Sequence, residues 1–437
     1  SEWYTQVVLK SGLADYAPIK GCMILREHSY AIWEKIQEIF NEAIKATGHR
    51  NVYFPMFIPE SFLKKEAEHF QGFVPQVAWV TMGGDNTLEE KLAIRPTSET
   101  IMYVTYAKWI RSWRDLPIKL NQWCNIVRWE TEATKLFLRT REFLWQEGHT
   151  AHATKEEADQ EVMEILNNYR DLMEKYLAIP VLAGKKTESE KFKGALYTTT
   201  LEALMPDGKA LQMGTSHQLG QNFSKVFDIK FIGEDEKEHY VWQTSWGIST
   251  RLIGAIAMVH GDDKGLVLPP KIAPVQVVIV PIPYKDADKE IILKKAREAF
   301  ENLEKSGIAI VLDDRTEYTP GWKFNEWELK GVPIRIEIGP KDVKEKRVTI
   351  ARRDTLERTA IKEEELIDVI TKMLDEIQNN LFKRAKKFLE DHTTTVKNYK
   401  EFKKALKKGE LIRACWCYNP TCEEKIKEET GATIRLI

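Results

Sequence analysis

Residues 137–149 read Phe137-Leu-Arg-Thr-Arg-Glu-Phe-Leu-Trp-Gln-Glu-Gly-His149, with two arginines, two carboxylates, a histidine and three large aromatic residues. Arg128-Trp-Glu130 lies just upstream, and the run from Trp246 to Arg251 ends far downstream in another arginine. A guanidinium group binds phosphate or carboxylate through two parallel hydrogen bonds and also stacks on flat rings. Arginines among strand-forming aromatic residues therefore predict a pocket for a planar anion. ATP is a candidate, because it carries both a polyphosphate and a purine.

Two interpretations of these charged residues remain open at this point. They can form surface salt bridges on a charged loop, where an exposed pair contributes only about 0–1 kcal/mol and needs no function. The aromatic neighbours favour a pocket instead. The sequence has no G-x-G-x-x-G motif, and Gly184-Lys-Lys-Thr187 lacks the glycine that a P-loop requires at position 179, which is Ile179. An ATP site would therefore rely on side chains, and the candidates are Arg128, Glu130, Arg139, Arg141 and Arg251.

Two further polar clusters are candidates for ligand contact. Arg95-Pro-Thr-Ser-Glu-Thr100 has the hydroxyls and proline of a helix N-terminus. The same stretch also fits a pocket in which Thr97 and the Glu99 carboxylate bind a substrate ammonium group. His217 stands among small residues that allow a ligand to approach closely, although a buried structural histidine is an equal alternative.

The cysteines predict at most one metal site. Cys417 and Cys422 have the spacing of half a four-cysteine zinc site, and Cys415 competes for the role. The other half would have to lie beyond Ile437, so reduced, unliganded thiols are the alternative. His149 and His152 are three positions apart, but the glutamate of a zinc-binding H-E-x-x-H motif is missing.

Size and charge restrict the class of protein. With 437 residues the chain is long enough for two or three domains. Its formal charge of −1 means that a polyanion must bind a local patch. No apolar run approaches the roughly 20 residues of a membrane span, and no secretory leader is visible. Five cysteines without a disulfide pattern fit a reducing compartment, so we expect a cytoplasmic protein with no membrane partner.

The first part of the chain, residues 1–270, predicts an α+β fold with an antiparallel sheet flanked by helices. Apolar periodicity indicates helices at 31–46, 155–177 and 253–259. Aromatic and β-branched runs indicate strands at 51–57, 122–130 and 141–146.

The second part, residues 271–375, follows a linker at 266–270 and predicts a small α/β domain that begins with a parallel strand pair. We expect strands at 275–280, 308–312, 334–338 and 347–352, and helices at 286–305 and 322–329. The third part, residues 376–437, is a charged, helix-rich extension. Residues 383–408 include ten basic residues and three acidic ones. This excess of positive charge favours a solvated helix face or contacts to phosphate.

Taken together, these motifs closely resemble those of the prolyl-tRNA synthetases of the archaeal and eukaryotic-like type. The resemblance covers essentially the whole chain. It is carried by Arg95–Thr100, Arg128–Glu130, Phe137–Thr150, Gly214–His217, Leu219–Phe223, Trp246–Arg251, His260–Pro270 and Gly321–Pro333.

The resemblance implies a class II catalytic core that activates L-proline with ATP and transfers it to the 3′ end of tRNA(Pro). It implies Arg128 and Arg251 as catalytic residues. For ATP it implies Arg128, Glu130, Arg139, Thr140, Gln212, Thr215, Ser249 and Arg251, with Mg²⁺ at the polyphosphate. For proline it implies Thr97, Glu99, Arg128, Phe143, Trp145 and His217.

The resemblance also assigns the rest of the chain. Residues 1–270 would be the catalytic domain, 271–375 the anticodon-binding domain with Glu328 and Arg335 as base readers, and 376–437 a zinc-binding-type extension. A homodimer is expected, with an interface near Tyr53-Phe-Pro55. About a hundred residues separate Glu142 from Arg251, which leaves no room for a large editing insertion. There are two rival interpretations: a synthetase-like enzyme that activates proline or another amino acid for a different acceptor, and a catalytically silent tRNA-binding or regulatory protein.

Overall fold

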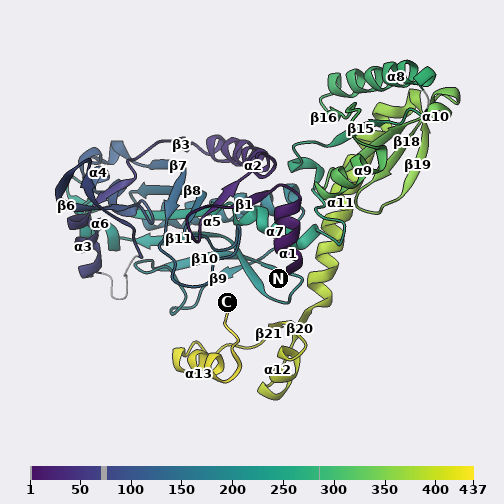
Figure 1. Cartoon of the computed structure of the whole chain (residues 1–437). Coiled ribbons are helices and arrows are strands. Elements are labelled where there is room, and N and C mark those ends of the chain that lie inside the picture. The colour runs from purple at the N-terminus through teal and green to yellow at the C-terminus, as the bar shows by residue number, and fades with distance from the viewer. Residues whose placement is uncertain (1, 70–75, 285) are drawn as a thin grey trace.

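The computed structural model describes residues 2–69, 76–284 and 286–437. A seven-stranded sheet forms the centre of the first part (Figure 1), and its strands run in the order β3-β7-β8-β14-β11-β10-β9. All neighbours are antiparallel except β3 and β7. The predicted antiparallel α+β core is therefore confirmed. The strands are β3 (Arg50–Asn51), β7 (Ile118–Val127), β8 (Glu142–His152), β9 (Leu182–Lys185), β10 (Tyr197–Leu204), β11 (Ala210–Gly220) and β14 (Trp242–Ser249).

Helices cover both faces of this sheet. The largest apolar cluster joins the sheet to α1 (Glu2–Lys10), α2 (Glu27–Ala46), α5 (Lys155–Asp171) and α7 (Arg251–His260). Within it Phe40 stacks on Tyr169, with ring centroids 5.0 Å apart. A second cluster packs α4 (Glu99–Trp109) and α6 (Asn222–Phe227) elsewhere on the sheet.

The three helices predicted for this part are present. The helix predicted at 31–46 begins one turn earlier, in α2. The helix predicted at 155–177 consists of α5 followed by a π-helical turn, η2 (Leu172–Tyr176). Its start is explained by a capping box, in which the Thr154 hydroxyl accepts from the Glu157 backbone and the Glu157 carboxylate accepts from the Thr154 backbone.

The prediction of one continuous strand at 51–57 is wrong. The chain forms β3, an irregular segment, and then β4 (Phe57–Pro59) in a different, three-stranded sheet with β6 (Asn86–Ile94) and β5 (Trp79–Gly83). Two local features break the strand: the Phe54 amide donates to the Gln122 side chain at 2.5 Å, and Pro55 has no amide hydrogen to donate. Helix α3 (Glu60–His69) follows β4.

The second part is a five-stranded sheet in the order β16-β15-β17-β18-β19, with β15 parallel to both of its neighbours. The predicted parallel pair is therefore confirmed. Strand β19 was not predicted, because its residues are mostly polar and exposed. The elements are β15 (Val277–Pro281), α8 (Asp286–Lys305), β16 (Ile310–Leu312), α9 (Pro320–Leu329), β17 (Ile334–Ile338), α10 (Pro340–Lys344), β18 (Arg347–Arg352) and β19 (Arg358–Lys362).

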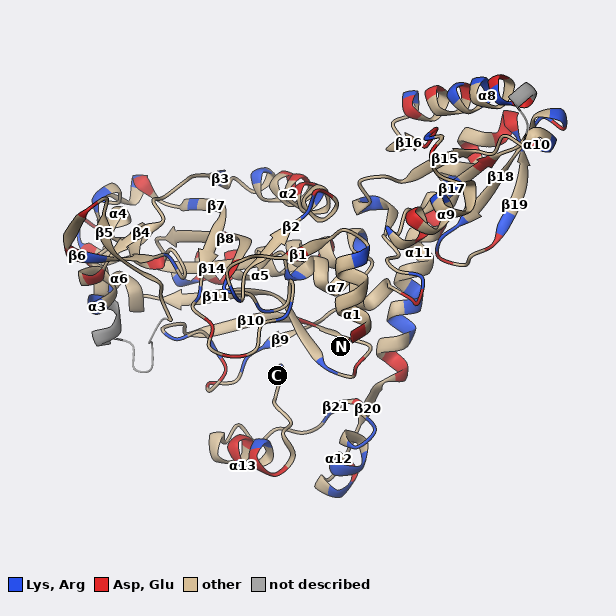
Figure 2. Cartoon of the chain, in the orientation of Figure 1, with Lys and Arg blue, Asp and Glu red and all other residues tan. Residues whose placement is uncertain are grey.

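The last part begins with the long helix α11 (Leu366–Asp391), which runs through residue 375, where a domain division was predicted. The chain continues through β20 (Thr393–Thr395), α12 (Tyr399–Leu406), β21 (Leu411–Arg413) and α13 (Pro420–Thr430), and then returns to the edge of the first sheet (Figure 1). There the Lys185 amide donates to the Ile437 carbonyl at 2.9 Å. The ribbon colours of Figure 2 show that Lys and Arg residues are concentrated on α12 and that basic and acidic residues are mixed along α8.

The remaining small elements are β1 (Ala14–Tyr16) paired with β2 (Met23–Leu25), β12 (Lys230–Ile232) paired with β13 (Glu238–Tyr240), and the 3-10 turns η1 (Trp113–Asp115), η3 (Pro270–Ile272) and η4 (Glu363–Glu365). Residues 142–251 are all described and belong to the main sheet, its helices and the β12–β13 hairpin, so no separate domain is inserted among them. Within the described residues, no helix is both long and apolar enough to span a membrane.

Candidate active site

A cavity of about 300 Å³ lies on the central sheet where β8, β11 and β14 run side by side. Most of the side chains predicted to bind ligand line it together, although they come from distant parts of the sequence. They are Thr97, Glu99, Arg128, Phe143, Trp145, Gln212, Thr215, His217, Ser249 and Arg251.

Strand alternation explains this convergence. Side chains two positions apart on a strand point to the same face, so Phe143, Trp145, Glu147 and His149 of β8 all face the cavity. Antiparallel pairing places Ser249 beside Trp145. The residue opposite Trp246 is Gly148, and a Cβ there would lie 2.1 Å from the Trp246 ring. The indole therefore requires a glycine in β8.

Arg128 is one of the residues that line the cavity. Its Nε donates to the Pro96 carbonyl at 3.1 Å, and its guanidinium lies 5.6 Å from the Phe143 ring and 5.5 Å from the Trp145 ring. Burial lowers the pKa of Arg128, while the nearby carboxylates of Glu99, Glu147 and Glu130 act in the opposite direction. The aromatic contacts hold the guanidinium by cation–π attraction and leave its Nη groups available for an anion.

Arg251 is the first residue of α7 and has spare capacity for hydrogen bonds. Its Nη2 donates to the Leu138 carbonyl at 3.2 Å, and its Nη1 donates to the Gln212 carbonyl at 3.4 Å. Its Nε is buried, and none of the described residues offers it an acceptor. A buried donor without a partner costs about 1–3 kcal/mol, so the site is prepared for an anionic ligand.

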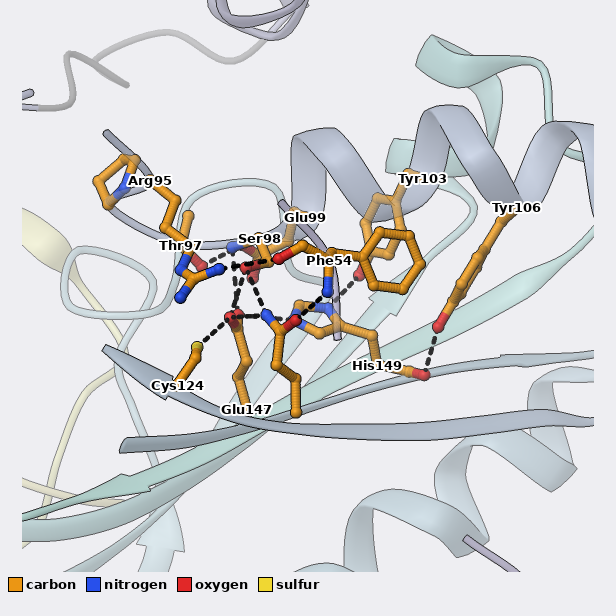
Figure 3. A network of polar contacts seen from close by, with 12 residues as sticks. Phe54, Arg95, Thr97, Ser98, Glu99, Tyr103, Tyr106, Cys124, Glu147 and His149 are labelled. Atoms are coloured by element: carbon orange, nitrogen blue, oxygen red, sulfur yellow. Dashed lines mark hydrogen bonds and ion pairs between the residues drawn. The ribbon is translucent and has the colours of Figure 1, made fainter. Parts of the chain in front are cut away.

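Glu99 is buried at the start of α4 and accepts a short hydrogen bond from the Thr97 hydroxyl. Behind it, Glu147 organises a polar network (Figure 3). Glu147 accepts from the Ser98 amide at 3.1 Å, from the Ser98 hydroxyl at 2.5 Å and from His149 Nε2 at 2.9 Å. The neighbours of Ser98 in the chain are Thr97 and Glu99, so Glu147 fixes the backbone that carries both of them.

The contact between Glu147 and His149 favours the ionised form of both side chains. Burial acts to raise the pKa of Glu147, but hydrogen bonds from His149, Ser98 and Gln122 outweigh it and lower that pKa. Burial acts to lower the pKa of His149, but Glu147 and the charge of Glu99 outweigh it and raise that pKa. Protonated His149 would offset part of the negative charge of the two buried carboxylates, Glu147 and Glu99.

The pKa of His217 is shifted in the opposite direction to that of His149. Burial lowers the pKa of His217 to about 3, so its ring is neutral. Its nitrogens contact the hydroxyls of Thr198 at 2.8 Å and Thr215 at 3.1 Å, and its ring lies 4.8 Å from Phe192. His217 is thus a partly buried histidine with two hydroxyl partners that also lines the cavity.

Three predicted ATP contacts lie outside the lining of the cavity, in the loop between β7 and β8. Arg139 is 46% exposed, forms a close ion pair with Glu132 and lies 3.8 Å from Glu130. The Thr140 hydroxyl donates to the Glu142 carbonyl at 2.8 Å. In this structure Arg139 therefore matches the salt-bridge interpretation. Arg141 also lies outside the lining, with its guanidinium 4.3 Å from the Trp129 ring centroid.

The sequence did not identify several residues that line the cavity. Strand alternation through Phe143 and Trp145 could have identified Glu147 and His149. Lys186, Glu190 and Phe192 also line the cavity, but they come from an irregular segment for which no pattern predicts a position.

Glu328 and Arg335, the predicted base readers, lie in the second part and contact each other. Arg335 Nη1 donates to the Glu328 carboxylate at 3.0 Å, and Arg335 Nη2 donates to Glu337 at 3.0 Å. The Arg335 guanidinium also lies 4.1 Å from the Phe324 ring. Carboxylate, guanidinium and flat ring together are suited to an unpaired base.

The thiols of Cys417 and Cys422 are close enough to form a hydrogen bond, which raises the pKa of Cys422. They can supply two ligands of a tetrahedral zinc site, which needs four. The part of the chain that the structure describes brings only Glu99, Glu147 and His149 together as a group of three potential ligands. Those three are already engaged with one another and with Thr97 and Ser98.

Three family models match successive parts of the chain. Residues 79–260 match the tRNA synthetase class II core domain (G, H, P, S and T). Residues 276–373 match an anticodon binding domain, and residues 399–437 match the C-terminal domain of prolyl-tRNA synthetase.

Curated relatives are similar over the whole chain. A proline–tRNA ligase of Natranaerobius thermophilus is 56% identical over 438 residues, which cover 100% of this chain and 90% of the relative. Proline–tRNA ligase 2 of Clostridioides difficile is 54% identical, with 100% and 90% covered. Proline–tRNA ligase 2 of Bacillus cereus is 55% identical, with 100% and 91% covered. The resemblance seen in the sequence is therefore confirmed, and the chain belongs to the proline–tRNA ligases, a family with a class II synthetase core.

Proposed function

We propose that the cavity on the central sheet activates L-proline with ATP and that the chain then transfers proline to tRNA(Pro). The observation that carries this proposal is the composition of a single cavity. A buried carboxylate, Glu99, lies with two guanidinium groups, Arg128 and Arg251, and with apolar rings. Such a set matches an amino acid with its ammonium and carboxylate together with a polyphosphate.

In the first step the proline carboxylate attacks the α-phosphate of ATP, which gives prolyl-adenylate and pyrophosphate. Glu99 and Thr97 bind the secondary ammonium, and Phe143, Trp145 and His217 enclose the ring. Arg128 binds the carboxylate and the α-phosphate together, so that the attacking and accepting groups are held in line. Its charge also stabilises the negative charge that develops at phosphorus.

The other predicted residues bind the nucleotide. Arg251 binds the γ-phosphate through the Nε that lacks an acceptor among the described residues. Gln212, Thr215 and Ser249 add polar contacts. The loop between β7 and β8 closes over ATP, which is then bound by Glu130, Arg139 and Thr140. Arg139 must break its ion pair with Glu132 to bind phosphate instead.

Mg²⁺ prefers oxygen ligands and is usually held by phosphates, water and few protein groups. The cavity fits this requirement, because Gln212, whose side-chain amide carries an oxygen, is among its lining residues. Bound there, Mg²⁺ would supply further neutralisation of the polyphosphate.

In the second step a hydroxyl of the terminal ribose of the tRNA attacks the carbonyl of prolyl-adenylate, which forms the prolyl ester of the tRNA and releases AMP. Glu328 and Arg335 read bases of the anticodon, which selects the tRNA. We also propose a cytoplasmic homodimer, with Cys417 and Cys422 contributing half of a zinc site.

The test is ATP–pyrophosphate exchange measured with each amino acid in turn, followed by charging of tRNA(Pro) with labelled proline. Proline should give the highest kcat/KM in exchange, and the label should become attached to the tRNA. Exchange with another amino acid that is faster than with proline would refute the substrate, and exchange without charging would refute the acceptor.

A further inference from the structure

The C-terminal end of α7 receives two arginines from later in the chain. Arg353 follows β18, and its Nη1 and Nη2 donate to the Asp262 carboxylate at 2.7 and 2.5 Å. Arg384 of α11 donates through Nη2 to the His260 carbonyl at 3.2 Å. Cations at a helix C-terminus complement the helix dipole, and the bidentate geometry fixes the orientation of the pair.

Arg353 also holds the end of α9. Its Nε donates to the Glu328 carbonyl at 2.9 Å, so the guanidinium bridges Asp262 and Glu328. The Arg353 side chain is only 2% exposed, whereas that of Asp262 is 42% exposed. A buried guanidinium needs all its partners, so this bridge cannot be loosened without cost.

The backbone segments on the two sides of this bridge are also in direct contact. The Leu266 amide donates to the Leu329 carbonyl at 3.0 Å, and the Leu268 amide donates to the Gly331 carbonyl at 3.1 Å. A Cβ at Gly331 would lie 2.7 Å from Leu266. The turn that follows Glu328 therefore packs directly against the segment that follows α7.

Helix α7 connects this junction to the cavity. It begins with Arg251, which lines the cavity, and ends at His260, two residues before Asp262. Ten residues of helix span about 15 Å. Arg353 thus binds both the segment that continues the cavity helix and the end of α9, which carries the proposed base reader Glu328.

We propose that Arg353 is a positioning residue for tRNA charging: it sets the place of Glu328 relative to α7, so that an RNA held by its anticodon presents its 3′ end to the cavity. This inference rests on the proposed function. Arg353 is not among the residues that line the cavity, so proline activation should not depend on it.

The test uses Arg353→Lys, which keeps the charge but loses the planar fork. The matched control is Arg352→Lys. Arg352 is the neighbouring residue and forms its own bidentate pair with Asp354, at 3.0 and 2.9 Å, within the later part of the chain. Three quantities are measured for each full-length variant: proline-dependent exchange, charging of tRNA(Pro), and charging of a tRNA(Pro) whose anticodon bases are substituted.

Arg353→Lys should lower kcat/KM for tRNA(Pro) about tenfold and leave exchange within about twofold. For the tRNA with the substituted anticodon, Arg353→Lys should lower charging by less than about twofold. The substituted anticodon and Arg353→Lys would disturb the same contact, and two such changes are not additive. Arg352→Lys should change none of the three. Asp262→Asn should reproduce the pattern of Arg353→Lys, because it weakens the same ion pair.

Unchanged charging of tRNA(Pro) by Arg353→Lys would overturn the inference. Equal losses with both tRNAs, or a loss of exchange, would also overturn it, since they would indicate a general effect on folding. Absence of proline-dependent exchange in the wild-type protein would instead refute the proposed function itself.

Discussion

The Glu147–His149 pair shows at the scale of single residues how the cavity is supported. The two side chains are buried and 2.9 Å apart, and neither belongs to the residues proposed to bind substrate. Glu147 holds Ser98, and Ser98 lies between Thr97 and Glu99 in the chain. Positioning in this site therefore depends on a buried ion pair behind the substrate groups.

The pair predicts a pH-dependent stability. The pKa of His149 is raised above 6.5 in the folded protein, so its contribution is fully present below pH 6.5 and is lost as the pH rises through the folded-state value. His149→Asn should cost about 1.5–3 kcal/mol near pH 6, the typical value of a hydrogen bond between charged groups. The cost should decrease towards pH 9. Urea denaturation of wild type and variant across this range measures it, and a cost that does not vary with pH would contradict a charged His149.

At the scale of elements, β8 depends on a glycine. Gly148→Ala would place a Cβ 2.1 Å from the Trp246 ring, which is packed against Phe40, His49 and Tyr169. Overpacking of this kind costs about 1–3 kcal/mol, so we expect a lower Tm and weaker proline-dependent exchange. The matched control is Gly321→Ala, since nothing lies within 4 Å of its Cβ position in α9. Equal Tm values for the two variants would contradict the close packing of β8 on β14.

The elements also show what the sequence could predict. Regular apolar patterns correctly predicted α2, α8, β17 and β18. Strand β19 was missed because its residues are mostly polar and exposed. The three-stranded sheet was missed because β4 and β5 have only three and five residues and β6 is mostly exposed. In the site, aromatic residues beside the arginines indicated a pocket, and the resemblance assigned Phe143 and Trp145 to proline. Only the resemblance supplied proline as the substrate, because hydroxyls, a carboxylate and rings do not by themselves specify one amino acid.

At the scale of the whole molecule, the proposed base readers lie in a separate part of the chain from the cavity. Arg335→Ala removes the ion pairs with Glu328 and Glu337 and the contact with Phe324. Charging of tRNA(Pro) should fall by about tenfold or more, while tRNA-independent exchange with proline stays nearly unchanged. Steady-state kinetics of both reactions measure this, and a parallel loss of both activities would argue against a role in anticodon recognition.

The central claim is that one cavity binds proline and ATP together for activation. The most direct measurement is proline-dependent ATP–pyrophosphate exchange by the wild-type protein and by Arg251→Ala. We predict measurable exchange for the wild type and a loss of about 10²–10³-fold in kcat for the variant, as when one preorganised donor to a developing charge is removed. Exchange by Arg251→Ala at the wild-type rate, or no proline-dependent exchange by the wild type, would contradict the account.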